Sequence, residues 1–214
     1  MTTFTTEDRI NATRVEQGSD EWKRLRLGHV TASNVADVMA KGKSGEATTR
    51  YKYKVRLVAE RMTDTIPESY SNSAMEWGVE MEPIARMQYE AKTNAFVDKT
   101  GFWHHPTIQW VGVSPDGLVG EDGLVEIKCP NTTTHLDYIF ANKVPSEYYK
   151  QVQCQLWVTG RKWCDFVSFD PRLPTRNQLL IIRAERDEAL IADMEVEVKQ
   201  FLSEVEDLII KLGE

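Results

Sequence analysis

SPDGLVGEDGLVEIK, residues 114–128, is the stretch of the sequence that decides the fold. The segment from Gly123 to Cys129 is short, β-branched and bounded by glycine, so it predicts a β-strand. Successive side chains of a strand point to opposite faces. Glu126 and Lys128 therefore project together from one face, while the reverse face of the strand is apolar.

Asp116 precedes this strand, with nine residues between it and Glu126. If Asp116 sits at the adjoining turn, two carboxylates and the ammonium group of Lys128 meet in one small volume. Two carboxylates this close repel each other unless a hard cation lies between them, and oxygen-rich sites of this kind suit Mg²⁺ or Mn²⁺. Lys128 can then orient or deprotonate a water molecule near the metal. Such a set of residues is suited to hydrolysing a phosphodiester.

A structural alternative is a surface hairpin in which Glu126 and Lys128 form an ion pair worth well under ~1 kcal/mol. Two further features favour the catalytic interpretation. Pro115 stands directly before Asp116, and Glu82 lies on a predicted helix from which it can supply a third carboxylate.

The remaining chain alternates helical and extended patterns, and no internal repeat is visible. Strands are expected at Thr107–Val113, Trp163–Phe169 and Gln178–Ala184, and the turn Gly120–Gly123 is expected to join the first of these to the catalytic strand. Apolar spacing and caps predict helices from Ser19 to Leu27, Thr31 to Ala40, Arg50 to Met62, Met75 to Lys92, Pro145 to Val158 and Ala189 to Leu212. Pro83 predicts a kink or a new helix start just after Glu82.

These elements predict an α/β or α+β fold in which helices flank a small central mixed sheet. The length of 214 residues fits one domain, so residues 1–214 are expected to form a single nuclease domain. Three cysteines without a C-x-x-C pair argue against a zinc ribbon, an iron–sulfur cluster or a disulfide scaffold. No apolar run is long enough to span a membrane, and the segment from Met1 to Arg14 is too polar for a signal peptide. We therefore expect a cytoplasmic protein without a membrane partner.

The net charge of −7 is unevenly distributed along the chain. The segment from Arg9 to Arg61 carries a balance of +6, and the segment from Arg183 to Glu214 carries −6. This asymmetry indicates two surfaces with different partners, or two solvated helical faces of opposite sign. Because positive charge on phosphates supplies most sequence-independent affinity for DNA, contacts to a DNA backbone are expected from Lys41, Lys43, Arg50, Lys52 and Lys54.

The motifs together resemble the family of phage lambda exonuclease and its viral-type recombination relatives, within the PD-(D/E)xK nuclease superfamily. The resemblance rests on blocks that follow in the same order from about Arg14 to the end of the chain. They are VEQGSDEW (15–22), LRLG (25–28), TAS (31–33), WG (77–78) leading to Glu82, SPDGL (114–118), EIKCP (126–130), QVQ (151–153), LWVT (156–159), DPR (170–172) and ERDE (185–188). Residues 132–150 depart from the family pattern, and no role is assigned to them.

The resemblance implies a role for each matching residue. Asp116, Glu126 and the backbone carbonyl of Ile127 would hold divalent metals, a pair of Mg²⁺ ions that Mn²⁺ can replace, with Glu82 acting on the second ion. Lys128 would hold and activate the attacking water. The 5′-terminal phosphate of the degraded strand would be bound by Arg26, Ser33, Ser114 and Gln151. Met75 would be an apolar wedge between the terminal base pairs.

The resemblance further implies an enzyme that degrades one strand of linear double-stranded DNA from a 5′-phosphate end to mononucleotides. It would leave a 3′ single strand for annealing-type homologous recombination in a bacterial or phage-infected cell. A ring-shaped homotrimer and a single-strand annealing protein as partner come from the resemblance alone. Two alternatives stay open: an endonuclease of the same superfamily, and a non-catalytic DNA-binding recombination protein.

Overall fold

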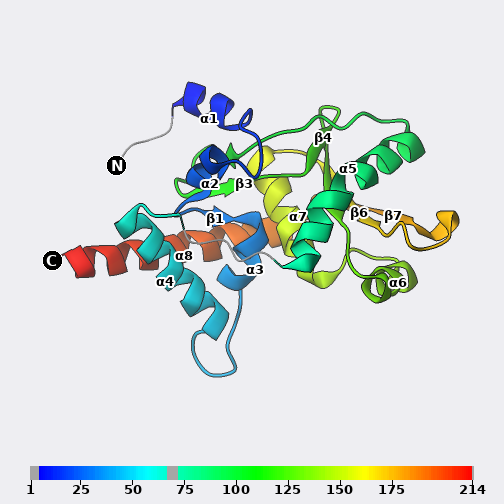
Figure 1. The fold of residues 1–214 in the computed structure, drawn as a ribbon. Coiled ribbons are helices and arrows are strands. Elements are labelled where there is room, and N and C mark those ends of the chain that lie inside the picture. Colours follow the sequence, from blue (N-terminus) through cyan, green and yellow to red (C-terminus); the bar gives the residue numbers. More distant parts are fainter. Residues whose placement is uncertain (1–4, 67–71, 214) are drawn as a thin grey trace.

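The computed structural model describes residues 5–66 and 72–213, and consists of helices packed around two mixed β-sheets (Figure 1). The α-helices are α1 (Thr6–Ala12), α2 (Asp20–Arg26), α3 (Val35–Val38), α4 (Thr48–Thr63), α5 (Ser73–Thr93), α6 (Thr132–Ala141), α7 (Ser146–Thr159) and α8 (Glu188–Gly213). Short 3₁₀ turns lie at η1 (Ala32–Asn34) and η2 (Thr175–Asn177). The strands are β1 (Val30–Thr31), β2 (Trp103–His104), β3 (Val111–Val113), β4 (Gly117–Val119), β5 (Gly123–Lys128), β6 (Trp163–Phe169) and β7 (Leu179–Glu185).

The larger sheet has the strand order β4-β5-β6-β7. Strand β5 pairs antiparallel with β4 and parallel with β6, and β7 returns antiparallel to β6. The parallel step from β5 to β6 is made through α6 and α7, because parallel strands require a crossover connection. The smaller sheet, β1-β3-β2, joins two segments that are far apart in the sequence. The predicted α/β class with mixed strands is confirmed.

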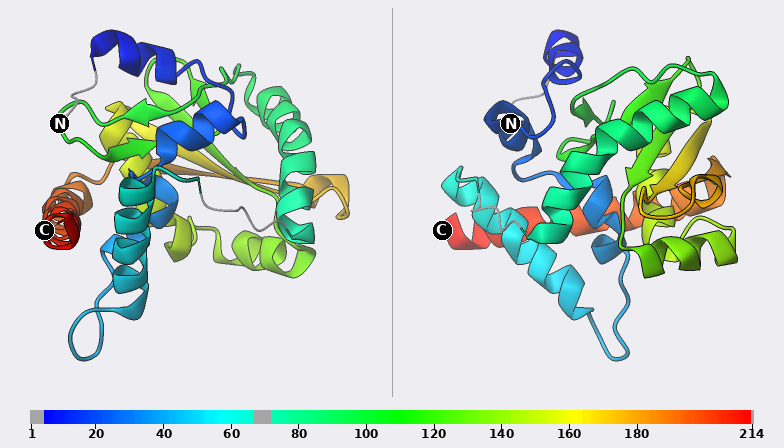
Figure 2. Two further views of the ribbon diagram at one scale, coloured as in Figure 1. Left: turned by 60° about the vertical axis from the view of Figure 1, so that its left-hand side comes forward. Right: turned by 45° about the vertical axis from the view of Figure 1, so that its right-hand side comes forward.

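Helix α7 lies at the centre of the molecule, and its residues 152–158 are all buried. Val152 and Leu156 pack on one face of the larger sheet, whereas Cys154 and Trp157 belong to the core of the smaller sheet, α4 and α8. The other face of the larger sheet is covered by α5 (Figure 2), through a cluster that includes Tyr89. The strand carrying Glu126 is therefore enclosed between two helices.

Most of the regular elements agree with the sequence prediction. Ser19 caps α2 as expected, by accepting a hydrogen bond from the backbone N–H of Trp22. The predicted helices α4, α7 and α8 and the predicted strands β5, β6 and β7 are present within a few residues of the expected bounds. Helix α5 runs continuously through Pro83, so the predicted new helix start after Glu82 is wrong. Residues 67–71, in the expected break before α5, lie outside the described residues.

The expected long strand at Thr107–Val113 is wrong in its first half. Only Val111–Val113 is a strand, and Trp110 before it has a φ of 64°. This left-handed conformation is uncommon for a bulky side chain and interrupts an extended segment. The turn Gly120–Gly123 joins β5 to β4, which the sequence prediction missed, whereas β3 belongs to the smaller sheet.

The expected helix at Thr31–Ala40 is mostly wrong as well. Thr31 ends β1 and pairs with Gly112, and the chain then passes through η1 into the single turn of α3. Helices α1 and α6 and strand β2 were not predicted. No helix in the described parts of the chain combines the length and apolar character that a membrane crossing needs.

Candidate active site

Asp116 and Glu126 are brought together by the register of β4 and β5. Gly117 pairs with Val125 in the antiparallel ladder, so the next position outward sets Asp116 across from Glu126. Asp116 Oδ2 accepts a hydrogen bond from the backbone N–H of Ile127 at 2.7 Å. The nine residues between Asp116 and Glu126 therefore form the short hairpin made by β4, the turn and the first part of β5.

The segment before Asp116 is tied to the N-terminal part of the chain. Gln17 Nε2 donates to the carbonyl oxygens of Pro115, at 2.7 Å, and Thr100, at 2.8 Å. The hydroxyl of Ser114 accepts a hydrogen bond from the indole N–H of Trp22 at 2.9 Å. These contacts anchor Ser114 and Pro115, the two residues that precede Asp116.

Glu126 is only 1% exposed, yet both of its carboxylate oxygens are bound. Oε1 accepts hydrogen bonds from Lys128 Nζ at 2.5 Å and Gln151 Nε2 at 2.6 Å. Oε2 accepts one from Gln155 Nε2 at 2.6 Å. Lys128 also lies 5.0 Å from the centre of the Tyr148 ring. Side chains of β5 and α7 thus converge on a single buried acid, as the predicted alternation of Glu126 and Lys128 on one face requires.

The electrostatics show an excess of negative charge at this point. Burial and the neighbouring carboxylate of Glu126 raise the pKa of Asp116 well above its ordinary value, and Lys128 opposes this only in part. Burial alone would lower the pKa of Lys128, but the nearby Glu126 and Asp116 outweigh it and raise that pKa. Lys128 is thereby held as a cation near both acids. Its charge does not fully offset the negative charge of the pair, because the pKa of Asp116 stays raised.

Glu82 stands nearby on α5 but does not join the two strand acids directly. Its Oε1 accepts a hydrogen bond from Arg86 Nη2 at 2.5 Å, and its charge contributes to the raised pKa of Asp116. Within the described ranges, no group of three His, Cys, Asp or Glu side chains is close enough to hold a metal ion.

The pair of strand acids nevertheless fits a hard cation. Asp116 and Glu126 offer oxygen ligands, which Mg²⁺ and Mn²⁺ prefer. Burial first, and then the charge of Glu126, raise the pKa of Asp116, and a bound cation would offset both effects by stabilising the ionised carboxylates. The donor set present is therefore two carboxylates, with the Ile127 carbonyl and Glu82 as further candidate ligands.

The four residues predicted to bind a 5′-phosphate are only partly brought together. The Arg26 guanidinium lies over the Trp22 ring, 4.2 Å from its centre, and the same indole binds Ser114, so these two meet on one side chain. Ser33 is exposed on η1, with its hydroxyl 3.3 Å from that of Thr31. Gln151 points instead to Glu126.

Arg26 has the properties of an anion-binding residue. Burial lowers the pKa of its guanidinium, and no carboxylate among the described residues forms a salt bridge with it. It lines a cavity of about 200 Å³ to which Lys23 and Arg56 add positive charge and Glu60 one negative charge. A partly buried guanidinium that forms no salt bridge among the described residues can offer a forked contact to phosphate oxygens.

The residues predicted to contact the DNA backbone divide into two groups. Lys41 and Lys43 are exposed on the loop between α3 and α4, which projects from the body of the molecule (Figures 1 and 2), and Lys52 is exposed on α4. Arg50 and Lys54 are 8% and 9% exposed and are bound by acids, so the prediction does not fit these two. The remaining candidate, Met75, is 53% exposed in the first turn of α5, and its wedge role stays a prediction.

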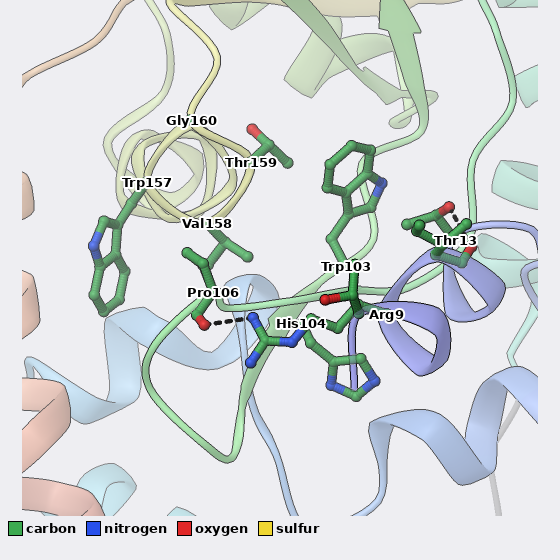
Figure 3. A pocket seen from close by; sticks show the side chains of 11 residues that line it. Arg9, Thr13, Trp103, His104, Pro106, Trp157, Val158, Thr159 and Gly160 are labelled. Atoms are coloured by element: carbon green, nitrogen blue, oxygen red, sulfur yellow. Dashed lines mark hydrogen bonds between the residues drawn. The ribbon is translucent and has the colours of Figure 1, made fainter. Parts of the chain in front are cut away.

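A separate cavity of about 420 Å³ lies between α1, β2 and the end of α7 (Figure 3). Trp103, Pro106, Trp157 and Val158 surround it, with Arg9 at its side and hydrogen-bonded to the carbonyl of Pro106 at 2.5 Å. None of the described residues that line it is acidic, so the hydrolytic chemistry is not located there.

A mixed sheet that carries Asp116, Glu126 and Lys128 on and beside one strand defines a member of the PD-(D/E)xK nuclease superfamily. Residues 21–162 match the YqaJ-like viral recombinase domain, and the chain belongs to this family. The resemblance inferred from the sequence motifs is thereby confirmed.

Solved structures support the same assignment. An alkaline exonuclease from Laribacter hongkongensis, LHK-Exo, is 50% identical, with a TM-score of 0.85 over 91% of this chain and 96% of that chain. A phage related exonuclease from Haemophilus somnus 129PT shares the fold, with 15% identity and a TM-score of 0.68 over 89% of this chain and 99% of that chain. The similarity to LHK-Exo, together with the family, supports a nuclease enzyme.

One curated relative is a larger protein. The uncharacterized protein R354 of Acanthamoeba polyphaga mimivirus is 27% identical over 168 residues, which make up 71% of this chain. The aligned part spans only 29% of the length of that protein.

Two contributors to the site escaped the sequence prediction. Gln155 lies one helical turn after Gln151 and so faces the same acid, a spacing that could have been recognised once Gln151 had been selected. Trp22 was quoted only as part of a motif, although it joins Arg26 to Ser114. No sequence pattern connects residues that are 92 positions apart.

Proposed function

We propose that this protein is a divalent-metal-dependent exonuclease that degrades one strand of linear double-stranded DNA from its 5′ end. The observation that carries the proposal is the pair of strand acids, Asp116 and Glu126, held together with Lys128 as the only cation in direct contact with either among the described residues. The family and the alkaline exonuclease relative support the reaction class.

In this proposal, each protein group has one task at the reacting phosphodiester. Asp116, Glu126, the carbonyl of Ile127 and Glu82 would hold two Mg²⁺ ions, or Mn²⁺ in their place. Bound there, the metal would offset negative charge on the phosphoryl group and make a water molecule easier to deprotonate. Lys128 would orient that water by hydrogen bonding.

The direction of degradation follows from the proposed recognition of a terminal phosphate. Arg26 would bind the 5′-phosphate through its guanidinium donors, aided by the hydroxyl groups of Ser33 and Ser114. Gln151 is close enough to the acids to donate either to Glu126 or to a nearby phosphate. The LHK-Exo protein has been crystallised in complex with dAMP, a nucleoside monophosphate of the kind that such degradation releases.

Two assembly proposals accompany the activity. The chain would form a ring-shaped homotrimer around DNA and would cooperate with a single-strand annealing protein in homologous recombination, where the 3′ single strand is the shared intermediate. Light scattering coupled to size-exclusion chromatography tests the first proposal. A mass of three chains is the expected result, and a stable monomer would contradict it.

The activity is tested on end-labelled linear duplex DNA, with and without Mg²⁺, and on covalently closed circles. We expect metal-dependent release of mononucleotides from linear DNA only, with a preference for 5′-phosphate over 5′-hydroxyl ends that Arg26→Ala reduces. Unchanged DNA with every divalent metal, or full activity in Lys128→Ala, would refute the proposal. Cleavage of closed circles would identify an endonuclease instead, and DNA binding without turnover would identify a non-catalytic protein.

A further inference from the structure

The two oxygens of the Glu126 carboxylate have different surroundings. Oε1 is shared by Lys128 and Gln151, whose side chains are only partly buried and border the candidate site. Oε2 is bound by Gln155 alone, which is 0% exposed. One oxygen therefore faces the site, and the other is fixed from the interior.

Gln155 does not fulfil the usual role of a buried amide. Its Nε2 donates to Glu126 at 2.6 Å, but its Oε1 is buried and has no hydrogen-bond partner among the described residues. Reversing the amide would not satisfy Oε1, because it would then face an acceptor carboxylate. Leaving an acceptor unpaired in the interior costs stability, so this side chain is better explained by its contact with Glu126 than by a contribution to folding.

Gln153, on the same helix, differs from Gln155 in that both of its amide atoms are hydrogen-bonded. It is equally buried, its Nε2 donates to the Glu185 carbonyl at 2.9 Å, and its Oε1 accepts from the Asp187 backbone N–H at 2.8 Å. Both polar atoms are satisfied, and both join α7 to the segment leading into α8. Gln153 is therefore a structural amide and a matched control for Gln155.

We propose that Gln155 is a positioning residue that orients the Glu126 carboxylate for a divalent cation. By binding Oε2 from the core, Gln155 fixes the rotation of the carboxylate and presents Oε1 to Lys128 and Gln151, which border the candidate site. Residues that orient a metal ligand in this way typically contribute 10–100-fold to metal affinity. The inference rests on the metal site of the proposed function and adds a residue to it.

The test is Mn²⁺ binding to the full chain, measured by isothermal titration calorimetry without DNA. Gln155→Met keeps the length of the side chain and removes the donor. We expect its Kd for Mn²⁺ to rise roughly 10–100-fold, with an unchanged circular dichroism spectrum. Gln153→Met should lower the thermal midpoint while leaving the Kd for Mn²⁺ unchanged. Gln155→Asn keeps the amide but shortens the side chain by one methylene, and it should also weaken Mn²⁺ binding. It replaces Gln155→Met in the test if the Met variant does not fold.

Failure of this inference can be distinguished from failure of the proposed function. If the unmodified protein binds Mn²⁺ and degrades DNA, and Gln155→Met binds Mn²⁺ equally well, the positioning role is overturned and the proposed function stands. Equal weakening by the Gln153 and Gln155 variants would also overturn it, because it would indicate general disturbance of α7. If the unmodified protein neither binds Mn²⁺ nor degrades DNA, the metal site itself is wrong.

Discussion

Acids and cations meet in two regions of this molecule, with opposite charge balance. Between α4 and α8, Glu204 receives two hydrogen bonds from Arg50 and one from Lys54, and Glu46 binds the same two cations. Hydrogen bonds from Arg50 and Lys54 lower the pKa of Glu204 to about 2. At β5, by contrast, two acids share Lys128, and the pKa of Asp116 is raised.

The Glu204 cluster stabilises the fold, whereas the cluster around Asp116 and Glu126 is suited to binding a cation. Two acids and two cations balance between the helices, and no further ligand is needed there. At the strand acids the chain supplies one cation too few, although Asp116 and Glu126 are costly to bring together. A site that is incompletely neutralised by its own chain is suited to take a cation from solution.

The largest effect is expected at the strand acids. Asp116→Asn removes a candidate metal ligand and should lower nuclease activity by roughly 10²–10³-fold or more. Because it also removes a carboxylate that repels Glu126, the metal-free protein should keep or gain thermal stability. Product release from labelled linear duplex and thermal unfolding in EDTA measure the two effects. A clear loss of stability in EDTA would show that Asp116 is a structural acid like Glu204.

The converse change is Glu204→Gln, which leaves Arg50 and Lys54 with Glu46 as their remaining acidic partner. Because Arg50 and Lys54 are buried while Glu204 is partly exposed, this loss should destabilise the protein by roughly 1–3 kcal/mol, while Mn²⁺ affinity stays the same. Urea unfolding measures the stability change. Glu206→Gln is the control on the same helix: Glu206 lies 4.0 Å from Arg61, and the loss should stay below about 1 kcal/mol. Equal losses for the two variants would contradict a special role for the Glu204 cluster.

Sequence patterns predicted the elements in which local signals agree. The strand β5 and the helices α4, α7 and α8 have clear periodicity and caps or breakers at their ends, and they were predicted correctly. The region from Thr31 to Ala40 was misassigned because pairing of Thr31 with Gly112, a contact across 81 positions, overrides a helix-like composition. Strand β4 was missed because its three residues are too few to show an alternation.

The candidate site divides in the same way. Asp116, Glu126 and Lys128 lie close in the sequence, so a strand and a turn were enough to predict their meeting. Arg50 and Lys54 were placed wrongly because charge counts along the chain do not reveal that Glu204, 150 or more positions away, binds both. The basic and acidic segments at the two ends of the sequence are thus partly each other's partners.

Acidic pH should weaken the fold through three buried histidines while the Glu204 cluster persists. Burial lowers the pKa of His29 to about 3 and those of His104 and His105 to about 4. In the unfolded chain these histidines bind a proton near pH 6.5, whereas in the folded protein they do so only near pH 4 or below. Their contribution to the free energy of unfolding is therefore fully present above pH 6.5 and is lost as the pH falls toward 4. Glu204, with a pKa of about 2, stays ionised throughout this range. Urea midpoints should stay level from pH 7.5 to about 6.5 and fall from there to pH 4.5, less steeply in His104→Phe. A flat profile over the whole range would contradict the buried neutral histidines.

The smallest effect is expected at exposed lysines, and it tests whether the two charged segments still differ at the surface. Lys52 is exposed on α4, whereas Lys199 on α8 pairs with Glu195. If DNA lies along the basic loop and α4, Lys52→Ala should weaken DNA binding a few-fold. It should also reduce the slope of the logarithm of the binding constant against the logarithm of the salt concentration by about 1. Lys199→Ala should change neither quantity. Fluorescence anisotropy with duplex DNA, without divalent metal and over several salt concentrations, measures both. A larger effect at Lys199 would place α8 along the DNA and would reverse the division of charge that the sequence suggested.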